Sequence, residues 1–261
     1  MRSVVVHYHI FKNAGTSVDR LLYESFGSSW STFDGSDPNQ ILSSGHLGAF
    51  LTSRPDVKAV SSHQARPPLP AGFDAVPIVF LRHPLDRVES VYEFVRRDPS
   101  QPSHELLSRL SLPEYVAWVL QEGPGSVVVR NYQTIHLSKA SFRTPHIYNA
   151  KADDNDFNEA IAFLESIPVV SIVEQFADSI ALLSKQISER ILPVHWAECR
   201  ANVSASRTGN LNERLEKLRG CLTGSQWDML IEANRFDLEL HAFAEKRLKA
   251  DLLGLPNPKP I

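Results

Sequence analysis

Short runs of β-branched and apolar residues alternate along this chain with longer segments in which apolar residues recur at helical spacing. Four short runs predict strands at residues 3–10, 57–61, 77–81 and 169–173. Helical segments lie between the first and second of these runs and between the third and fourth, and consecutive strands that are joined by helices usually form parallel sheets. The pattern therefore predicts an α/β fold, a three-layer sandwich with a central, mostly parallel sheet.

The longer segments predict helices that cover this sheet. They lie at residues 84–97, 113–120, 156–165, 176–187, 211–219 and 236–249. Ser111 and Glu114 have the spacing of a capping box at the start of the helix over residues 113–120. No change in composition marks a domain boundary, so we expect one domain over residues 1–255 and a flexible tail over residues 256–261.

Composition narrows the classes of protein to which this chain can belong. Hydrophobic residues make up 43% of the 261 residues and charged residues 22%, which is typical of a globular protein rather than a disordered one. The formal net charge of −3 excludes a strongly basic field that would attract nucleic acid. An anionic ligand would therefore need a local cluster of positive groups.

Cysteine content and hydropathy indicate the compartment. The two cysteines, Cys199 and Cys221, are too few for a disulfide framework, and we expect both to be reduced thiols. No segment reaches the ~20 apolar residues of a membrane span, and the first residues lack the apolar run of a signal peptide. We therefore expect a cytoplasmic protein without nucleic-acid partners and without a membrane span.

A loop between the first predicted strand and the next helix carries the sequence Phe11-Lys12-Asn13-Ala14-Gly15-Thr16-Ser17. A loop in this position directs backbone N–H groups and the positive end of a helix dipole outward, which favours phosphate binding. Gly15 permits close approach of a ligand, and Lys12 adds a full positive charge. The pattern differs from the ATP/GTP loop, in which lysine follows the last glycine. Alternatively, the segment is an ordinary helix start with Ser17 as N-cap.

A second polar segment follows the third predicted strand. Arg82 lies at the carboxyl end of that strand, where open α/β sheets bind their ligands. Its planar guanidinium matches two phosphate oxygens. Along the next helix, Asp86, Ser90, Glu93 and Arg97 recur opposite the apolar face, so periodicity does not force Ser90 into the core. Alternatively, this helix face is solvated and carries an Arg–Asp pair.

Together these two segments resemble the nucleotide site of sulfotransferases that use 3′-phosphoadenosine 5′-phosphosulfate (PAPS). In that family a loop of the type P-K-x-[GA]-G-T-[ST] accompanies a later strand–helix element of the type R-[DN]-P-x-x-R-x-x-S-x-Y. The chain matches the second pattern at Arg82, Pro84, Arg87, Ser90 and Tyr92. Phe11 and His83 depart from the patterns, in place of proline and of an acidic or amide residue.

A third match narrows the family. The segment Arg130-Asn131-Tyr132-Gln133-Thr134 resembles the N-x-Q-T signature of carbohydrate sulfotransferases related to the heparan 2-O enzyme. Residues 170–176, 202–204 and 237–247 also resemble the C-terminal half of that group. The resemblance implies the P-loop-NTPase-like sulfotransferase fold. It also implies transfer of a sulfuryl group from PAPS to a carbohydrate hydroxyl.

The resemblance further implies a division of roles within the nucleotide site. The first loop would hold the 5′-phosphosulfate through Lys12, Asn13, Ala14, Gly15, Thr16 and Ser17. Arg82 and Ser90 would hold the 3′-phosphate, whereas Ser206, Arg207 and Thr208 would close over the nucleotide. The product nucleotide would be 3′-phosphoadenosine 5′-phosphate (PAP), and the transfer would need no metal.

Two residues are expected to carry the chemistry. Lys12 would stabilise the charge of the leaving phosphate. His63 would act as the general base, because an imidazole titrates near neutral pH and the related carbohydrate enzymes have a catalytic histidine after the corresponding strand. His46 is the alternative base. His7 and His9 share one strand face, but without a third ligand they indicate no metal site.

Fewer residues indicate the acceptor. His46, Arg66 and Asn131 are candidate substrate ligands, and Asn131 and Gln133 either orient the acceptor or brace the site. Basic residues that would suit an acidic sugar are Arg66, Arg96, Arg97, Arg130 and Lys151, with scattered surface charges as the alternative. The resemblance favours a glycan or other small hydroxyl acceptor over a phenol, a steroid or a peptide tyrosine.

Two other functions fit parts of the pattern. A catalytically silent module that binds PAP would use Lys12 and Arg82 but not His63. A small-molecule kinase would need a lysine after the loop glycine and a metal-binding carboxylate at the end of the third strand. The sequence has neither residue at these positions.

Overall fold

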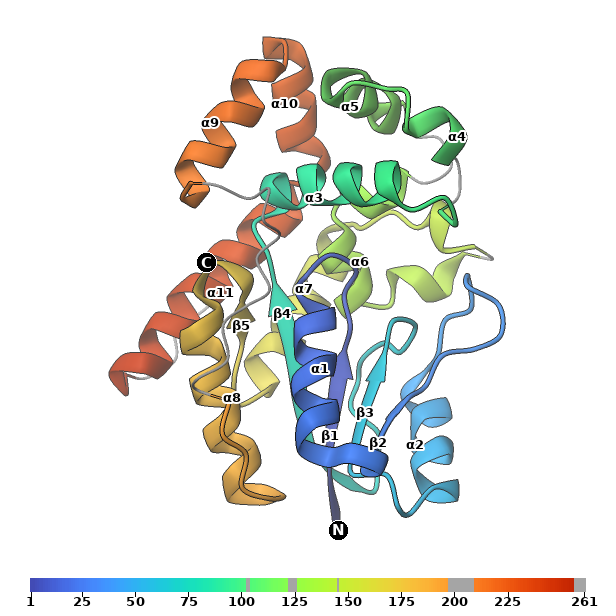
Figure 1. Cartoon of the computed structure of the whole chain (residues 1–261), viewed down its shortest axis with the longest axis vertical. Coiled ribbons are helices and arrows are strands. Elements are labelled where there is room, and N and C mark those ends of the chain that lie inside the picture. Colours follow the sequence, from blue (N-terminus) through green and yellow to red (C-terminus); the bar gives the residue numbers. More distant parts are fainter. Residues whose placement is uncertain (102–103, 122–125, 145, 197–208, 256–261) are drawn as a thin grey trace.

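A computed structural model describes residues 1–101, 104–121, 126–144, 146–196 and 209–255 (Figure 1). Within these residues five strands form a sheet in the order β2-β3-β1-β4-β5, and each pair of neighbours is parallel. The strands are β1 Arg2–Tyr8, β2 Trp30–Thr32, β3 Ala59–Ser62, β4 Phe73–Leu81 and β5 Ser171–Ile172. The predicted α/β fold with a central, mostly parallel sheet is confirmed.

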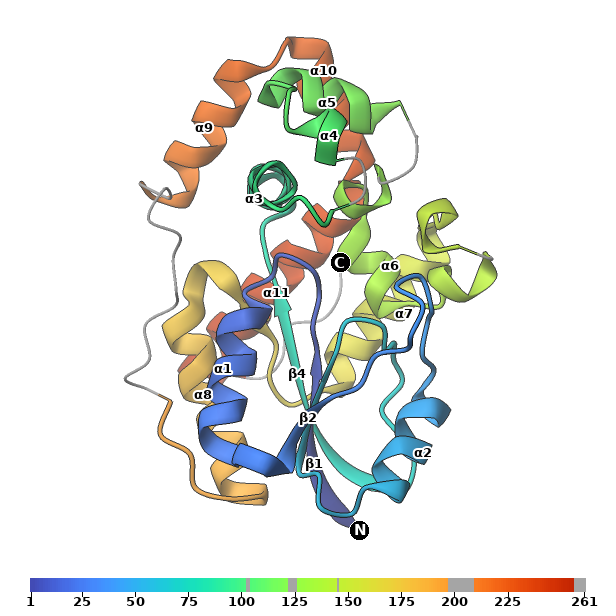
Figure 2. The same cartoon turned by 45° about the vertical axis from the view of Figure 1, so that its right-hand side comes forward.

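Helices cover both faces of the sheet and its carboxyl end. They are α1 Gly15–Phe26, α2 Ser44–Ser53, α3 Pro84–Arg97, α4 His104–Leu107, α5 Leu112–Leu120, α6 Tyr132–Leu137, α7 Asp154–Ser166, α8 Phe176–Arg190, α9 Leu211–Cys221, α10 Gly224–Ala233 and α11 Arg235–Leu253. Figure 2 shows α1 and α8 on one side of the sheet and α2, α6 and α7 on the other, which confirms the three layers. The helix α3 crosses above the carboxyl end of the sheet.

Alternating side chains of β1 explain why the sheet is covered on both faces. Val4, Val6 and Tyr8 pack into one apolar cluster with residues of α2, α6 and α7. Val5 belongs to a second cluster, which includes Leu22 of α1 and side chains of α8. Because successive residues of a strand point to opposite faces, one continuous apolar run contributes to two cores.

A third apolar cluster joins α3 to the helices above the sheet. Val91 of α3 packs in this cluster with Val116 of α5, Leu218 of α9 and Leu230 of α10. The apolar face that the sequence predicts for α3 is confirmed, and the bounds Pro84–Arg97 match the prediction. The helix is therefore held from above while its first turn follows directly from β4.

Strand bounds differ from the predicted ones where the chain leaves the sheet. The first strand ends at Tyr8 rather than at residue 10, because the chain turns there and the N–H of Ile10 donates to the carbonyl of Tyr8 at 2.9 Å. The second predicted strand corresponds to β3, which is Ala59–Ser62 rather than residues 57–61. The last strand shortens to Ser171–Ile172, since Val173–Gln175 form a 3₁₀ helix.

Most of the helical predictions are confirmed. The capping box is present, with the N–H of Ser111 donating to Glu114 Oε2 at 2.7 Å at the start of α5. The predicted segments 156–165, 211–219 and 236–249 lie inside the slightly longer α7, α9 and α11. The strand β2 and the helices α2, α4, α6 and α10 were not predicted.

Two further predictions concern the cysteines and the last residues of the chain. Cys221 is an exposed free thiol, whereas Cys199 and the tail over residues 256–261 lie outside the described residues. Among the helices that the structure describes, none combines the length and the apolar content needed to cross a bilayer.

Candidate functional site

Polar side chains gather at the carboxyl edge of the sheet, where four neighbouring strands end. In sheet order, Asp34 follows β2, His63 follows β3, Lys12 follows β1 and Arg82 follows β4. The strand order changes direction at β1, because the chain adds β2 and β3 on one side of it and β4 on the other. Ligands of open α/β sheets bind outside the carboxyl ends of the strands at such a point.

The loop after β1 has the backbone geometry of an anion site. Lys12 and Ala14 are both in the left-handed region, with φ of 65° and 61°, on either side of Asn13. Turns of this kind bring successive N–H groups onto one concave surface. Helix α1 begins at Gly15 with Ala14 as N-cap, and among the described residues no side chain caps it. The alternative of Ser17 as N-cap is therefore wrong, and the first-turn N–H groups face outward.

Gly15 is required by the close approach of a histidine. A Cβ atom at this position would lie 1.9 Å from Nε2 of His9, so any larger residue would displace the imidazole. The ring of His9 in turn stacks on the ring of His63, with 3.9 Å between centroids. The predicted general base therefore lies next to the predicted phosphate loop.

Arg82 connects the two predicted phosphate segments directly. Its Nη1 donates to the carbonyl oxygen of Lys12 at 2.8 Å, and its Nε donates to Asp86 Oδ2 at 3.0 Å. Arg214 of α9 donates to the other oxygen of Asp86 at 2.7 Å. The Arg–Asp pair is present, but Asp86 is buried rather than on a solvated helix face, because it lies between two guanidinium groups.

The side chain of Lys12 extends toward α3. Its amine lies 4.4 Å from the ring centroid of Phe94, which is a cation–π distance. Ser90, which is half-buried, is one turn before Phe94 on the same helix. The amine of Lys12 therefore lies against α3, one helical turn beyond Ser90.

Gln133 joins the same two loops from inside the molecule. Its Oε1 accepts from Nδ2 of Asn13 at 2.7 Å and from the N–H of Arg82 at 2.9 Å. Its Nε2 donates to the carbonyl of Arg82 at 2.9 Å. The side chain of Asn13 is buried and also donates to the carbonyl of Phe80, at 2.7 Å. Gln133 therefore braces the site, which is one of the two roles that the sequence left open.

Asn131 and Asp237 cap each other's helices. Oδ1 of Asn131 accepts from the N–H groups of Phe236 and Asp237 at the start of α11, at 3.0 and 3.2 Å. The carboxylate of Asp237 accepts from the N–H groups of Gln133 and Thr134 at the start of α6, at 3.0 and 2.8 Å. Burial raises the pKa of Asp237, and these hydrogen bonds oppose that rise. The N-x-Q-T segment therefore ties α6 to α11.

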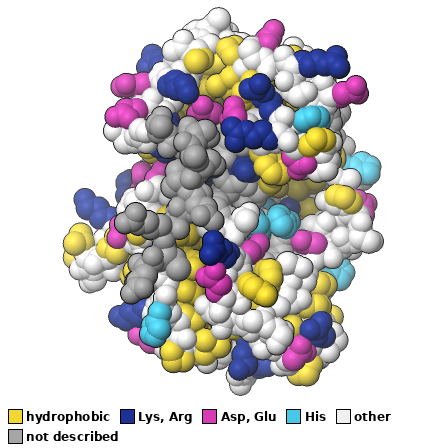
Figure 3. All heavy atoms as spheres, in the orientation of Figure 1, with side chains coloured by type: hydrophobic (Ala, Val, Ile, Leu, Met, Phe, Trp, Pro, Cys, Tyr) yellow, Lys and Arg dark blue, Asp and Glu magenta, His cyan; other side chains and the backbone are white. Residues whose placement is uncertain are grey.

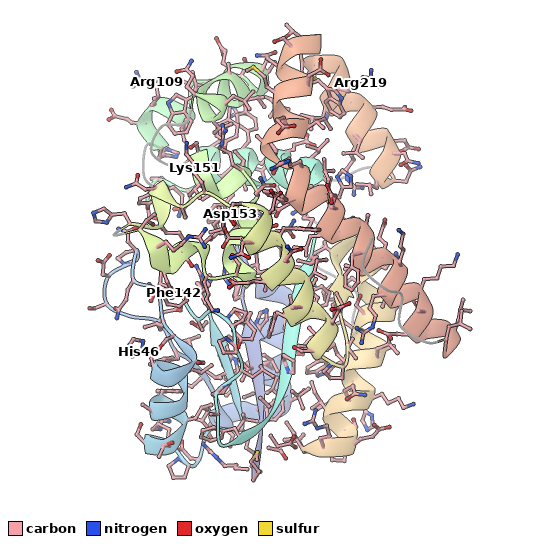
Figure 4. The ribbon with its side chains drawn as sticks, turned by 180° about the vertical axis from the view of Figure 1, so that it is seen from behind. His46, Arg109, Phe142, Lys151, Asp153 and Arg219 are labelled. Carbon is pink, nitrogen blue, oxygen red and sulfur yellow. The ribbon has the colours of Figure 1, made fainter. Side chains whose placement is uncertain are left out.

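His63 and His46 differ in their surroundings. The side chain of His63 is 52% exposed, and its Nδ1 lies 3.1 Å from Asp34 Oδ2. His46 is exposed on α2, and its Nδ1 accepts from the N–H of Ser43 at 3.2 Å as part of a capping box. Figure 4 shows His46 on the back of the molecule, at the outer side of α2. His46 therefore makes a capping contact at the start of α2, whereas His63 stacks on His9 beside the loop.

Asp19 joins His7 and His9 in a polar cluster next to the loop, a contact that the sequence alone does not predict. Asp19 of α1 lies 2.8 Å from Nδ1 of His7 and 2.9 Å from Nδ1 of His9. Burial lowers the pKa of His7 to about 4, although the hydrogen bond with Asp19 opposes the change. One side-chain atom from each of these three residues lies within 4.8 Å of the other two, a spacing that would also suit ligands of a metal ion. Both short distances are those of imidazole–carboxylate hydrogen bonds.

Arg66 supports the turn that carries His63. It is 1% exposed, and its Nη1 donates to the carbonyl oxygen of His63 at 2.9 Å. Burial lowers the pKa of Arg66 to about 10. The same Nη1 donates to the carbonyl of Ala65 at 3.1 Å and lies 3.3 Å from Nε2 of His136. Burial also lowers the pKa of His136 well below its usual value, so a neutral ring faces the guanidinium.

The remaining basic candidates lie in two other places. Arg96 and Arg97 are exposed on α3, where Arg97 pairs with Glu93 at 2.7 Å. Arg130 and Lys151 line a cavity of about 600 Å³ beside α10 and the start of α11, together with Arg235, which was not among the candidates. Figure 4 shows Lys151 on the back of the molecule. Ser206, Arg207 and Thr208 lie outside the described residues.

On the face opposite this cavity, histidine and basic side chains lie near the middle of the molecule (Figure 3).

No protein-family model matches the chain. An uncharacterized protein of Archaeoglobus fulgidus is 25% identical over 254 residues, which cover 92% of this chain and 94% of that protein. The crystal structure of a sulfotransferase from Alicyclobacillus acidocaldarius matches 90% of this chain and 96% of its own, with a TM-score of 0.40 and 16% identity. Similarity this low does not establish a function, which has to be inferred from the residues of the site.

Proposed function

We propose that this protein is a PAPS-dependent sulfotransferase that acts on a hydroxyl of a carbohydrate. The observation that carries the proposal is the hydrogen bond from Arg82 to the carbonyl of Lys12 at 2.8 Å. It joins the two segments that resemble the 5′- and 3′-phosphate sites of that family at one edge of the sheet. A single bisphosphorylated nucleotide is the ligand that needs both sites at once.

The loop after β1 suits the 5′-phosphosulfate. Left-handed residues at Lys12 and Ala14 and the start of α1 at Gly15 supply outward N–H groups without a capping side chain among the described residues. Thr16 and Ser17 add hydroxyl donors in the first turn of the helix. These are neutral or positive donors, which is what an anionic group requires.

Arg82 and Ser90 suit the 3′-phosphate. Arg82 is the first residue after β4, and α3 begins two residues after Arg82. Ser90 lies in the second turn of α3. Asp86 fixes the guanidinium of Arg82 by contacts at 3.0 Å and, through its backbone carbonyl, at 3.3 Å. A guanidinium that is already oriented loses less conformational entropy when an anion binds.

In the proposed reaction, the acceptor oxygen attacks sulfur in line with the departing phosphate oxygen. One sulfur–oxygen bond forms and the sulfur–oxygen bond to the phosphate breaks. His63 takes the proton of the acceptor hydroxyl on Nε2. Lys12 and the N–H groups of the loop stabilise the negative charge that remains on the phosphate.

Fewer contacts support the choice of acceptor. The N-x-Q-T segment supports a saccharide by resemblance alone, since Asn131 and Gln133 use their side chains to brace the fold. Arg66 is buried behind His63 and suits electrostatic support of the site rather than direct contact with a sugar. A small glycan that reaches His63 from the exposed side is the acceptor that this arrangement favours.

Incubation with radiolabelled PAPS and a panel of oligosaccharides tests the proposal, with the sulfated product identified by mass spectrometry. We expect transfer by the wild type and loss of transfer in His63→Ala, with PAP affinity retained in that variant. His46→Ala is the matched control and should keep full activity. A fully active His63→Ala would move the general base elsewhere.

Thermal-shift measurements separate the alternatives. A sulfotransferase is stabilised by PAP, whereas a kinase is stabilised by ATP with magnesium. Stabilisation by ATP with magnesium but not by PAP would overturn the proposal. Stabilisation by PAP without transfer to any member of a broad acceptor panel would favour the silent nucleotide-binding module.

A further inference from the structure

Asp34 makes an unusually complete set of contacts with the turn after β3. Its Oδ1 accepts from the hydroxyl of Ser62 at 2.9 Å and from the N–H groups of His63 and Gln64 at 2.9 and 3.2 Å. Its Oδ2 lies 3.1 Å from Nδ1 of His63. One carboxylate therefore fixes both the backbone and the ring of His63.

One face of the His63 imidazole is held as well. The ring of His9 stacks on it with 3.9 Å between centroids, and Nδ1 of His9 is bound to Asp19 at 2.9 Å. His63 nevertheless keeps 52% of its side chain exposed. A ring that is held at Nδ1 and on one face but open to solvent presents its remaining nitrogen, Nε2, to a ligand.

The charge of Asp34 determines which nitrogen carries the proton. Partial burial raises the pKa of Asp34, but the hydrogen bonds from His63 and Ser62 outweigh this and leave the pKa below its usual value. An ionised carboxylate only accepts hydrogen bonds. Nδ1 of a neutral His63 must therefore be the donor, so that Nε2 carries a lone pair.

We propose that Asp34 is a positioning residue that holds His63 in the tautomer with the proton on Nδ1 and with Nε2 ready to accept a proton. The consequence for catalysis rests on the proposed sulfotransferase function, whereas the tautomer does not. The hydrogen bonds of Asp34 described above go to Ser62, His63 and Gln64 and not to either nucleotide segment, so its effect on turnover passes through His63.

The substitution Asp34→Asn reverses the donor at one atom while keeping the shape of the side chain. The amide oxygen can still accept from Ser62 and from the N–H groups of His63 and Gln64. The amide nitrogen then takes the position of Oδ2 and donates to Nδ1 of His63. The ring must carry its proton on Nε2, where it cannot act as a base.

Nitrogen-15 NMR of histidine-labelled protein tests the tautomer directly. The His63 signals are assigned by their loss in His63→Ala. We expect the wild type to show a protonated Nδ1 and an unprotonated Nε2, and Asp34→Asn to show the reverse. Asp37→Asn is the matched control, because Asp37 is exposed on the same loop and its Oδ1 accepts from the N–H of Asn39 at 2.9 Å. A wild-type His63 with the proton on Nε2 would overturn the proposal.

Kinetics test the consequence. We expect Asp34→Asn to lower kcat by about 10²- to 10⁴-fold while the PAP dissociation constant stays within a factor of about 2. Unchanged kcat in a variant with the reversed tautomer would also overturn the role of Asp34. If the wild type transfers no sulfuryl group to any acceptor, the proposed function fails, and the NMR result alone decides the role of Asp34.

Discussion

Arg82 and Lys12 are 70 residues apart in the chain, and Nη1 of Arg82 donates to the carbonyl oxygen of Lys12 at 2.8 Å. The contact holds the loop after β1 against the residue that follows β4. Gln133 reinforces it from the core, because its amide binds the N–H of Arg82 and the side chain of Asn13. The two loops therefore behave as one unit, and changes in either should affect the other.

Replacing Arg82 should weaken nucleotide binding. Arg82→Ala removes the proposed 3′-phosphate donor and also the hydrogen bond that holds Lys12. We expect PAP affinity, measured by titration calorimetry, to fall by about 10- to 100-fold, since hydrogen bonds to charged groups are worth about 1.5–3 kcal/mol. Arg109→Ala is the control, because that side chain is 77% exposed at the far end of the molecule (Figure 4). Equal affinity in the two variants would contradict the assignment.

Gln133→Leu should destabilise the fold. The substitution keeps the bulk of the side chain but leaves the buried N–H and carbonyl of Arg82 without partners. We expect a loss of about 2–4 kcal/mol in the free energy of unfolding, measured by urea denaturation. Gln121→Leu changes an exposed residue and should stay within about 0.5 kcal/mol of the wild type. A loss for Gln133→Leu as small as this control would argue against the brace.

Asp86→Ala should be costly for a different reason. Its carboxylate lies between Arg82 and Arg214, whose side chains are 4% and 17% exposed, so the substitution leaves buried positive charge uncompensated. Breaking a buried ion pair at one partner costs about 3–5 kcal/mol. The control Glu93→Ala breaks an exposed pair on the same helix and should cost less than about 1 kcal/mol. Similar unfolding free energies for the two variants would contradict this reading of α3.

Stability should fall as the pH decreases from about 6.5 to 4. Burial lowers the pKa of His7 from 6.5 to about 4, so in this window the unfolded chain binds a proton that the folded chain does not. Stability rises with pH wherever the unfolded state binds more protons, so acid destabilises the fold here. A shift of this size corresponds to about 3 kcal/mol.

The variant His7→Gln isolates this contribution. Urea unfolding at a series of pH values should show a shallower decline for His7→Gln than for the wild type between pH 6.5 and 4. His146→Gln removes an exposed histidine and should leave the wild-type slope unchanged. A wild-type slope that persists in His7→Gln would assign the pH dependence to other groups, such as the half-buried His83, whose pKa is also lowered to about 4, mainly by desolvation.

The sequence predicted the parts of the site that follow long, regular elements. The strand over residues 77–81 is a continuous apolar run and the helix Pro84–Arg97 has strong apolar periodicity, so Arg82 and Ser90 could be assigned to a strand end and a helix. The loop at Lys12–Ser17 can be identified as a strand-to-helix connection in the same way, because it lies between a β-branched run and an amphipathic helix.

Residues that depend on tertiary contacts could not be predicted. Asp34 follows β2, a strand of three residues that is too short for a periodic signal. Asp19 lies on α1, and only the packing of that helix on β1 brings it to His7 and His9. The sequence suggested that Arg66 was accessible, but the bridge between Leu42 and Ala65 draws this segment into the core.

A crystal structure of the protein with PAP is the most direct test of the proposed nucleotide site. We predict that the 5′-phosphate binds the N–H groups at the start of α1, and that the 3′-phosphate lies beside Arg82 and Ser90. PAP bound in the cavity lined by Arg130 and Lys151, or PAP that contacts only one of the two strand ends, would contradict the account.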